Sequence, residues 1–421
     1  MKIKKIKFEN FRLFENLEVN FPDSNFIVLI GNNGAGKTSI LEGIAICLNS
    51  FVEKLFNINS KIGFGKSSVS VGKENGFVIL TIDDNGTKTE INVKSLNQGI
   101  KNEINEINPR YKETPLKVSL LIYYQVGRTT NLSVISKGRK TVNRSASNCY
   151  ENAFSNNFAG LETFENWFNS ELRNELIIGK KMNDINFEIP SLKIIRTALR
   201  TFFDVLNPET YQNISVESNE DFSINYASEY PNLVFSINNK NLSYHQLSSG
   251  EKVVFILICD IARRLLIAND YSENAIEGEG IVLIDELELH LHPNWQLKIV
   301  NALKATFPNV QFIATTHSVK VITSLEQQDV LVLDNGKVYN INQNPLGRDD
   351  NSALEEFMDS SKRPVDIENK ISEIFNKLAG KNLNYNEIEG DLEKLKSILS
   401  TDDPIFVRFN AIIERKKLLE V

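Results

Sequence analysis

The chain has 421 residues, of which 41% are hydrophobic and 24% are charged, so it is neither a disordered nor a fibrous protein. Its 47 Lys and Arg are outnumbered by 54 Asp and Glu, and the net charge of −7 argues against a protein coated with positive charge for nucleic acid. Three scattered cysteines exclude a disulfide framework. With neither a long apolar run nor a signal-peptide pattern, the sequence predicts a soluble, cytoplasmic protein that needs a partner for any membrane role.

Short apolar runs in the first part of the chain predict strands, because they alternate with polar residues or are apolar throughout. These runs are residues 3–21, 26–30, 77–82, 87–93 and 116–124. A helix is predicted over Lys37–Phe51, where apolar residues recur at helical spacing. From Arg128 to Asn207 the sequence is polar and helical, and we interpret residues 128–213 as an insertion on the core.

The next part of the chain alternates strands with helices. Strands are predicted over residues 214–242, 280–284, 310–315, 330–333 and 338–341, and helices over residues 252–268 and 295–307. This alternation indicates an α/β fold with a largely parallel sheet. After Gly347, two apolar stripes through Ile367 and Ile388 and a helix start at Pro404 predict a helical tail. We therefore divide the chain into residues 1–127, 128–213, 214–346 and 347–421.

The strongest motif is the phosphate-loop pattern G-N-N-G-A-G-K-T at Gly31–Thr38, which lies between a predicted buried strand and a predicted helix. A triphosphate carries several negative charges, which the backbone N–H groups of a glycine-rich loop and of a helix start can hold without side-chain bulk. Lys37 would bridge the β- and γ-phosphates, and Thr38 would offer its hydroxyl to Mg²⁺. The motif thus predicts a site for a nucleoside triphosphate and Mg²⁺.

A second motif, Ile281–Glu286, places a carboxylate at the carboxyl end of a predicted strand, where ligands bind in open α/β sheets. Asp285 would hold Mg²⁺ through water, and Glu286 would polarise the attacking water. An acidic pair after a strand is also a common helix cap. Because a phosphate loop is present as well, we favour the catalytic interpretation.

A third motif, L-S-S-G-E-K at Leu247–Lys252, resembles the signature sequence of the ABC ATPase superfamily, although Ser248 by itself would be a good helix cap. Two further residues stand where that superfamily has them. Gln125 follows a predicted strand, as in a Q-loop, and His317 follows another, as a switch histidine does. Either residue alone would more often be structural, but five elements in this order identify the chain, by resemblance, as an ABC-type ATPase.

The resemblance implies a fold, cofactors and site residues. The fold would be an ABC ATPase head with a parallel phosphate-loop sheet, an antiparallel β subdomain, the helical insertion and the C-terminal helical tail. The cofactors would be ATP and Mg²⁺. In this superfamily the phosphate loop of one chain faces the signature of another. Because this chain has one of each, the active site would form between two chains, in an ATP-sandwich dimer within an even-numbered homo-oligomer. The implied nucleotide-binding residues are Gly31, Asn32, Asn33, Gly34, Ala35, Gly36, Lys37, Thr38, Ser39, Ser248, Ser249, Gly250 and Glu251; the metal-binding residues are Thr38, Gln125 and Asp285; the catalytic residues are Lys37, Gln125, Glu286 and His317.

The first residues, K-I-K-K-I-K-F-E-N-F-R, resemble the opening of the RecF, structural maintenance of chromosomes (SMC) and overcoming-lysogenization-defect group. In that group Arg12 would lie near the nucleotide. The segment E-L-E-L-H-L-H-P at Glu286–Pro293 also resembles the group and replaces the D-loop of transporters. We therefore interpret His290 and His292 as loop residues, with a pair of metal ligands as the alternative.

Further segments narrow the resemblance to a family of bacterial ATPases that includes PtuA, the ATPase subunit of Septu and retron-linked antiphage modules. They are Leu121–Arg128, Gly278–Gln296, Phe307–Ser318, Asp350–Met358 and Ser361–Pro364. Such ATPases assemble with an HNH-type nuclease subunit, so the resemblance implies an antiphage defence complex. The tail reads as helices and lacks the Toprim pattern of relatives with their own nuclease, so we expect no intrinsic nuclease activity. A RecF-like, ATP-gated DNA repair or clamp protein is the alternative.

Two surface features allow two interpretations each. Lys137, Arg139, Lys140 and Arg144 put four positive charges in eight residues, either as a solvated loop or as a contact with DNA phosphates. The apolar stripes of the tail either pack on their own domain or contact the nuclease or other ATPase chains.

Overall fold

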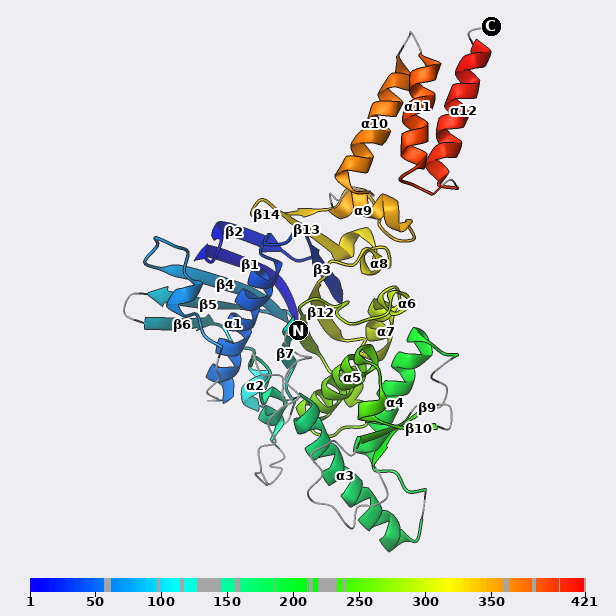
Figure 1. Ribbon diagram of the computed structural model, residues 1–421. Coiled ribbons are helices and arrows are strands. Elements are labelled where there is room, and N and C mark those ends of the chain that lie inside the picture. Colours follow the sequence, from blue (N-terminus) through cyan, green and yellow to red (C-terminus); the bar gives the residue numbers. More distant parts are fainter. Residues whose placement is uncertain are drawn as a thin grey trace. The chain divides into compact units, whose positions relative to one another are not determined.

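The computed structural model describes most of the chain, which divides into two compact units, residues 1–350 and 351–421 (Figure 1). The described residues are 1–56, 62–96, 99–113, 117–126, 145–155, 160–184, 186–209, 211, 215–218, 233–237, 240–358, 363–380, 384–400 and 402–419.

A six-stranded sheet forms the centre of the first unit, in the order β14-β13-β3-β12-β11-β7. Its strands are β3 (Phe26–Ile30), β7 (Leu120–Tyr124), β11 (Gly280–Ile284), β12 (Val310–Thr315), β13 (Val330–Asp334) and β14 (Lys337–Asn340). All pairs are parallel except β13 with β14. Every residue of β3, β7, β11 and β12 is buried, as expected of strands covered on both faces. The predicted parallel sheet is confirmed.

A second, antiparallel sheet has the order β2-β1-β4-β5-β6. It consists of β1 (Lys2–Phe11), β2 (Phe14–Asn20), β4 (Gly76–Asp84), β5 (Thr87–Leu96) and β6 (Gly99–Asn105). The hairpin between β4 and β5 turns at Asn85 and Gly86, which both have positive φ, as a two-residue turn of this type requires. The long helix α1 (Lys37–Phe56) contacts strands of both sheets. The predicted antiparallel sheet is thus confirmed, and α1 packs between it and the six-stranded sheet.

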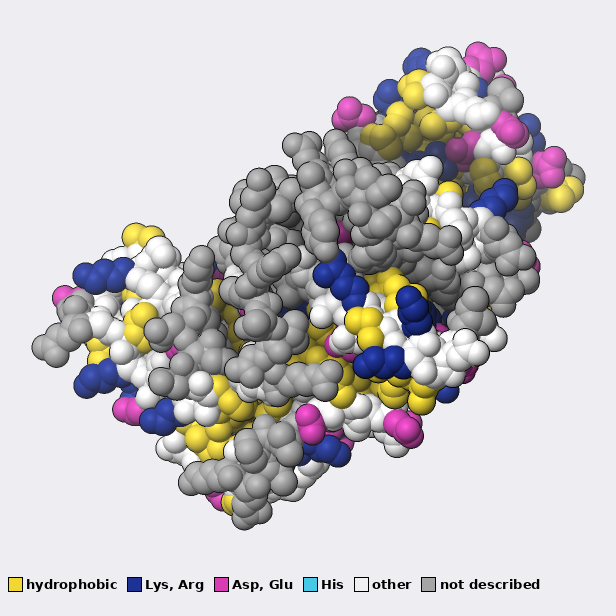
Figure 2. Space-filling model, turned by 90° about the horizontal axis from the view of Figure 1, so that it is seen from below, with side chains coloured by type: hydrophobic (Ala, Val, Ile, Leu, Met, Phe, Trp, Pro, Cys, Tyr) yellow, Lys and Arg dark blue, Asp and Glu magenta, His cyan; other side chains and the backbone are white. Residues whose placement is uncertain are grey.

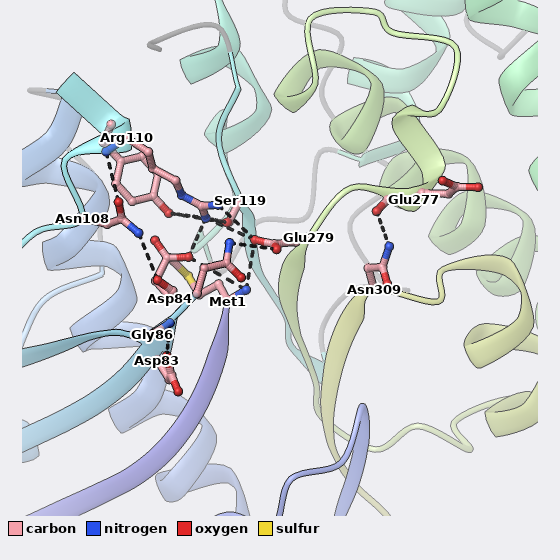
Figure 3. Close-up of polar contacts among 12 residues, drawn as sticks. Met1, Asp83, Asp84, Gly86, Asn108, Arg110, Ser119, Glu277, Glu279 and Asn309 are labelled. Carbon is pink, nitrogen blue, oxygen red and sulfur yellow. Dashed lines mark hydrogen bonds and ion pairs between the residues drawn. The ribbon is translucent and has the colours of Figure 1, made fainter. Parts of the chain in front are cut away.

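A cluster of charged groups joins the end of β4 to the beginning of β11. Arg110, in the short helix α2 (Arg110–Glu113), donates to Asp84 at 2.6 Å and to Glu279 at 3.2 Å (Figure 3). Asp84 is 1% exposed; burial raises the pKa of its carboxyl, and the Arg110 charge opposes this shift. Because Asp84 and Glu279 belong to segments of different sheets, Arg110 ties the antiparallel sheet to the strand that leads into the site.

Helices α3 (Gly160–Met182) and α4 (Pro190–Leu206) come from the segment that we interpret as an insertion. They are joined by buried polar contacts, including an ion pair of Arg196 with Glu175 at 3.1 Å. Both helices pack against α5 (Ser249–Ala268). A three-stranded sheet follows, with β8 (Ser215–Ser218), β9 (Leu233–Ile237) and β10 (Lys240–Ser243). Beyond β11 lie the helices α6 (Pro293–Gln296), α7 (Ile299–Thr306) and α8 (Val319–Ile322).

The C-terminal unit is helical, as predicted. After α9 (Asp350–Met358), the helices α10 (Val365–Ala379), α11 (Tyr385–Lys396) and α12 (Pro404–Leu419) pack side by side (Figure 1). The two predicted apolar stripes meet in one core with Phe406 and Phe409. The stripes therefore pack within their own unit, the first of the two interpretations considered for them. No described helix is both long and apolar enough to cross a bilayer.

Candidate functional site

The phosphate loop runs from the end of β3 into the first turn of α1. Gly31, Gly34 and Gly36 have φ of 148°, 80° and 107°, a region that L side chains rarely adopt. A Cβ atom on Gly31 would lie 2.2 Å from the Leu333 carbonyl oxygen. At Gly31, both backbone conformation and space therefore require glycine, and the loop can leave the sheet sharply and lead directly into α1.

Lys37 folds back over this loop. Its Nζ donates to the carbonyl oxygens of Gly31 at 2.8 Å and of Asn32 at 3.1 Å. Burial lowers the pKa of the Lys37 ammonium, and the nearby charges of Asp285, Glu286 and Glu288 oppose this shift. A cation therefore sits between the phosphate loop and a group of carboxylates.

Asp285 is the carboxylate closest to the loop. The Thr38 hydroxyl lies 3.0 Å from one of its oxygens and 3.2 Å from the other. Thr315, at the end of β12, donates to Asp285 at 2.6 Å, and the Asp285 amide donates to the Tyr124 carbonyl at 2.9 Å. Asp285 is 2% exposed. Groups from the ends of β7 and β12 and from the start of α1 thus converge on one buried residue, which follows β11.

Glu286 turns sharply away from β11. Its φ is 49°, unusual for a residue other than glycine and a form of strain that collects at functional sites. Its amide donates to the Thr315 hydroxyl at 2.8 Å. Because the Thr315 hydroxyl accepts from Glu286 and donates to Asp285, this one side chain sets the positions of both acidic residues.

His317 and Gln125 follow strands on either side of β11. Ile284 pairs with Tyr124 of β7 and with Ala314 of β12, so both residues leave the sheet at the level of Asp285. The His317 amide donates to Glu288 at 2.5 Å, and the Thr316 hydroxyl donates to the same carboxylate at 2.6 Å. Sequence reasoning did not select Glu288, although its place as the next acidic residue after Glu286 was a usable signal.

Arg12 lies beside the beginning of α1. It has a φ of 52°, its Nη1 is 3.5 Å from the Ser39 hydroxyl, and it forms an ion pair with Glu42. Burial raises the pKa of the Glu42 carboxyl, and the Arg12 charge opposes this shift. Glu42 was not selected from the sequence, because its partner lies 30 residues away, in the turn between β1 and β2.

The signature segment forms the start of α5. Ser248 is the helix cap: its Oγ accepts from the Glu251 amide at 3.3 Å, and Glu251 accepts from the Ser248 amide at 2.7 Å. Ser248 and Ser249 are exposed, whereas Gly250 is buried. A Cβ atom on Gly250 would lie 2.5 Å from the His290 carbonyl oxygen. The cap leaves both serine side chains open to a ligand.

Burial raises the pKa of the Glu251 carboxyl, whereas hydrogen bonds from Tyr211 and Ser248 lower it, and the net direction is downward. Glu251 is therefore ionised at neutral pH. A carboxylate accepts hydrogen bonds better than a carboxylic acid does, which suits its role in the cap of α5.

His290 and His292 have structural contacts. His292 Nδ1 accepts from the Asn294 amide at 3.3 Å and caps α6, and His290 has a φ of 65°. Among the described residues, no group of three His, Cys, Asp or Glu side chains is arranged to hold a metal ion. The cap on α6 is in keeping with the interpretation of His292 as a loop residue.

Two family models match successive parts of the chain. Residues 1–186 match the family described as "AAA ATPase domain", and residues 179–323 match "AAA domain, putative AbiEii toxin, Type IV TA system". The chain is 28% identical to the "Retron Ec83 probable ATPase" of Escherichia coli, over 99% of this chain and 87% of that protein. It is 27% identical to the "Septu protein PtuA" of Bacillus mycoides, over 79% of this chain and 40% of that protein.

Among solved structures, an SMC head bound to the C-terminal winged-helix domain of ScpA is similar, with a TM-score of 0.46 and 13% identity, over 81% of this chain and 98% of that one.

Proposed function

Because the chain is an ABC-type ATPase of the RecF and SMC group, homologous to retron ATPases and to Septu PtuA, we propose that it is the ATP-hydrolysing subunit of an antiphage defence complex. ATP-dependent dimerisation of the chain regulates a partner nuclease of the HNH type. The single observation that carries the proposed chemistry is the contact of Thr38 with Asp285 at 3.0 Å, which joins the phosphate loop to the carboxylate at the end of β11.

The residues at this edge of the sheet fit ATP and Mg²⁺. Glycines with positive φ expose loop amides at a helix start, which suits phosphate groups, and Thr38 and Asp285 offer the oxygen donors that Mg²⁺ prefers. Mg²⁺ would neutralise charge on the phosphates. Lys37 contacts the β- and γ-phosphates, and Glu286 accepts the proton of the attacking water.

Gln125 and His317 contribute from the neighbouring strand ends. Gln125 would be a further oxygen donor for the metal, and His317 would contact the γ-phosphate. Glu288 is a positioning residue for His317, because it accepts from the backbone amide of that residue. Arg12 lies beside Ser39 and adds positive charge near the phosphates.

A complete site needs two chains. Ser248 and Ser249 are exposed at the start of α5, and in the proposed dimer they and the Gly250 amide meet the γ-phosphate that a second chain holds. ATP then adds contacts that exist only in the dimer, and hydrolysis removes them. A ligand shifts an equilibrium between two states only through such a difference in affinity, so this arrangement makes ATP a switch.

The Glu286→Gln variant tests this mechanism. It should bind ATP, form a dimer on size exclusion with ATP, and lose at least about 10²-fold in turnover, the usual contribution of a general base. Lys37→Ala should lose both binding and dimerisation. The matched control is Glu277→Gln, an exposed carboxylate outside the site, which should behave as the parent does. Parental turnover in Glu286→Gln would show that another group activates the water.

The defence role is tested by combining the chain with an HNH-type nuclease subunit, which the proposal expects a neighbouring gene to encode. We expect the two to copurify and to cut DNA or RNA in a way that depends on the nucleotide, whereas the ATPase chain alone with Mg²⁺ should cut nothing. Retention of DNA by the ATP-bound chain alone, with no nuclease partner, would instead favour a RecF-like clamp.

A further inference from the structure

The hydrogen-bond cap of the signature helix includes one residue from outside the signature. Tyr211, which follows α4, donates its hydroxyl to Glu251 Oε1 at 2.5 Å. The other oxygen of the same carboxylate, Oε2, accepts from the Ser248 amide at 2.7 Å. Glu251 thus has one oxygen on the signature backbone and the other on Tyr211, so a displacement of Tyr211 changes the position of the cap.

Packing fixes the ring of Tyr211. The residue is 4% exposed, and its ring centroid lies 4.6 Å from that of Phe203 on α4, 6.4 Å from that of Phe255 on α5 and 5.8 Å from that of Trp295 on α6. Its amide donates to the Asn207 carbonyl at the end of α4. Tyr211 is therefore attached to α4 through its backbone and to three helices through its ring.

The same cluster reaches the segment between β11 and α6. Trp295 lies in α6, directly after Glu286–Pro293, and the His290 carbonyl contacts the buried Gly250. The start of α5 is therefore enclosed by two segments, one from α4 and one from the loop that carries Glu286. A displacement of either segment is therefore expected to move the start of α5, because packed interiors transmit displacement.

We propose that Tyr211 is a positioning residue that holds the Glu251 cap in the geometry in which Ser248 and Ser249 contact the γ-phosphate of a second chain. Through Tyr211, the α3–α4 region controls hydrolysis at the site of the partner chain rather than at its own. This inference rests on the proposed ATP-sandwich dimer. Tyr211 touches no nucleotide itself and acts through Glu251.

The test uses mixed dimers in which only one site can hydrolyse ATP. A Glu286→Gln chain, in large excess, is mixed with the parental chain before ATP is added. The site that turns over then combines the parental phosphate loop with the signature of the Glu286→Gln chain. Adding Tyr211→Phe to the Glu286→Gln chain should lower turnover about three- to tenfold, the effect of losing one hydrogen bond of ordinary strength. Placing Tyr211→Phe on the hydrolysing chain instead should lower it far less.

Phenylalanine keeps the ring and its packing, so a general folding defect is separated from the loss of the hydroxyl. We expect kcat to fall with KM for ATP nearly unchanged, and Glu251→Gln combined with Tyr211→Phe to lower the rate no further than the more damaging single change. Tyr339→Phe, which removes the hydroxyl of a ring that is 48% exposed on β14, is the matched control and should leave turnover unchanged.

A positive control distinguishes the role of Tyr211 from the ATP-sandwich dimer on which it depends. Ser249→Glu on the Glu286→Gln chain should abolish turnover, because a carboxylate would repel the γ-phosphate. If Ser249→Glu lowers the rate and Tyr211→Phe does not, the role of Tyr211 is refuted and the dimer stands. If Ser249→Glu has no effect either, the ATP-sandwich arrangement itself is refuted.

Discussion

The hydroxyl of Thr315 contacts both acidic residues that follow β11. Its hydroxyl donates to Asp285 at 2.6 Å and accepts from the Glu286 amide at 2.8 Å. Asp285 is buried, so each hydrogen bond that it accepts offsets part of the cost of removing its charge from water. Glu286 needs its amide held because its φ of 49° costs free energy that the surroundings must supply.

Thr315→Val should therefore impair catalysis more than binding. Valine has nearly the same shape but removes the hydrogen bonds that Thr315 makes with Asp285 and with the Glu286 amide, so we expect kcat for ATP to fall on the order of tenfold with KM changed little. Steady-state ATPase kinetics measure this effect. Thr306→Val is the control, because that buried hydroxyl bonds only the Ala302 carbonyl within α7. Equal losses in the two variants would contradict a specific role of Thr315.

At the scale of elements, α1 connects the site to both sheets. Its first turn carries Lys37 and Thr38, and its later turns contact the antiparallel sheet. At Gly43, α1 packs tightly against that sheet, since a Cβ atom there would lie 2.2 Å from the Phe8 ring. Phe8 is fully buried and stacks with Phe11 at 5.2 Å, so it has little space in which to move.

Gly43→Ala should destabilise the first unit by roughly 1–3 kcal/mol, the usual cost of an extra methyl group in a packed core. This cost exceeds the gain in helix propensity of about 1 kcal/mol. Urea denaturation measures the difference. Gly390→Ala, in α11 with open space around it, is the matched substitution and should stabilise its helix instead. An unchanged or higher stability of Gly43→Ala would show that α1 can move away from the sheet.

At the scale of the whole molecule, the chain consists of two units with separate cores. All residues assigned to the nucleotide site lie within residues 1–350. The C-terminal helices pack around Ile371, Ile374, Leu392 and Phe409, and the Arg363 guanidinium pairs with Asp403 at 2.7 and 2.9 Å. Because its apolar stripes are satisfied internally, a partner would have to use the outer surface of this unit.

Deleting Asp366–Val421 should leave the ATP-dependent dimer of the Glu286→Gln variant intact, because that dimer requires only the first unit. If the tail joins dimers or holds the nuclease, the larger assembly should be lost. Light scattering of the Glu286→Gln protein with ATP, with and without the tail and with and without the nuclease subunit, separates these outcomes. Loss of the dimer itself would place the tail in the ATP interface.

The distribution of charge on the surface bears on whether the chain contacts DNA. On the face seen in Figure 2, basic and acidic side chains are interspersed among the described residues, in keeping with the net charge of −7. The basic segment with Lys137, Arg139, Lys140 and Arg144 lies outside the described residues. Its contact with DNA phosphates stays a hypothesis, which the salt dependence of DNA binding by an Arg139→Glu, Lys140→Glu variant would test.

Local sequence predicted most of the elements and the motifs, although the single helix predicted over residues 295–307 is divided into α6 and α7, and β6 was not predicted. The continuous apolar runs at Phe26–Ile30 and Gly280–Ile284 predicted the buried strands, and the glycines of the phosphate loop predicted its turn, because each signal depends on residues that are neighbours in sequence. The order of five motifs along the chain predicted the ABC type and, through it, the strand ends at which Asp285, Gln125 and His317 lie.

Only the tertiary structure identified the groups that position the residues of the site. Thr315, Glu288, Glu42 and Tyr211 act through contacts with residues that are 29, 29, 30 and 40 positions away. Only Glu288, as the next acidic residue after Glu286, had a usable signal in the sequence. The threonine, the tyrosine and the glutamate within α1 carry no local pattern that marks such a role. Which of them meets a strand end, a helix cap or an arginine is decided by the packing of α1, α4 and α5 against two sheets, because contact there depends on distance in space and not in sequence.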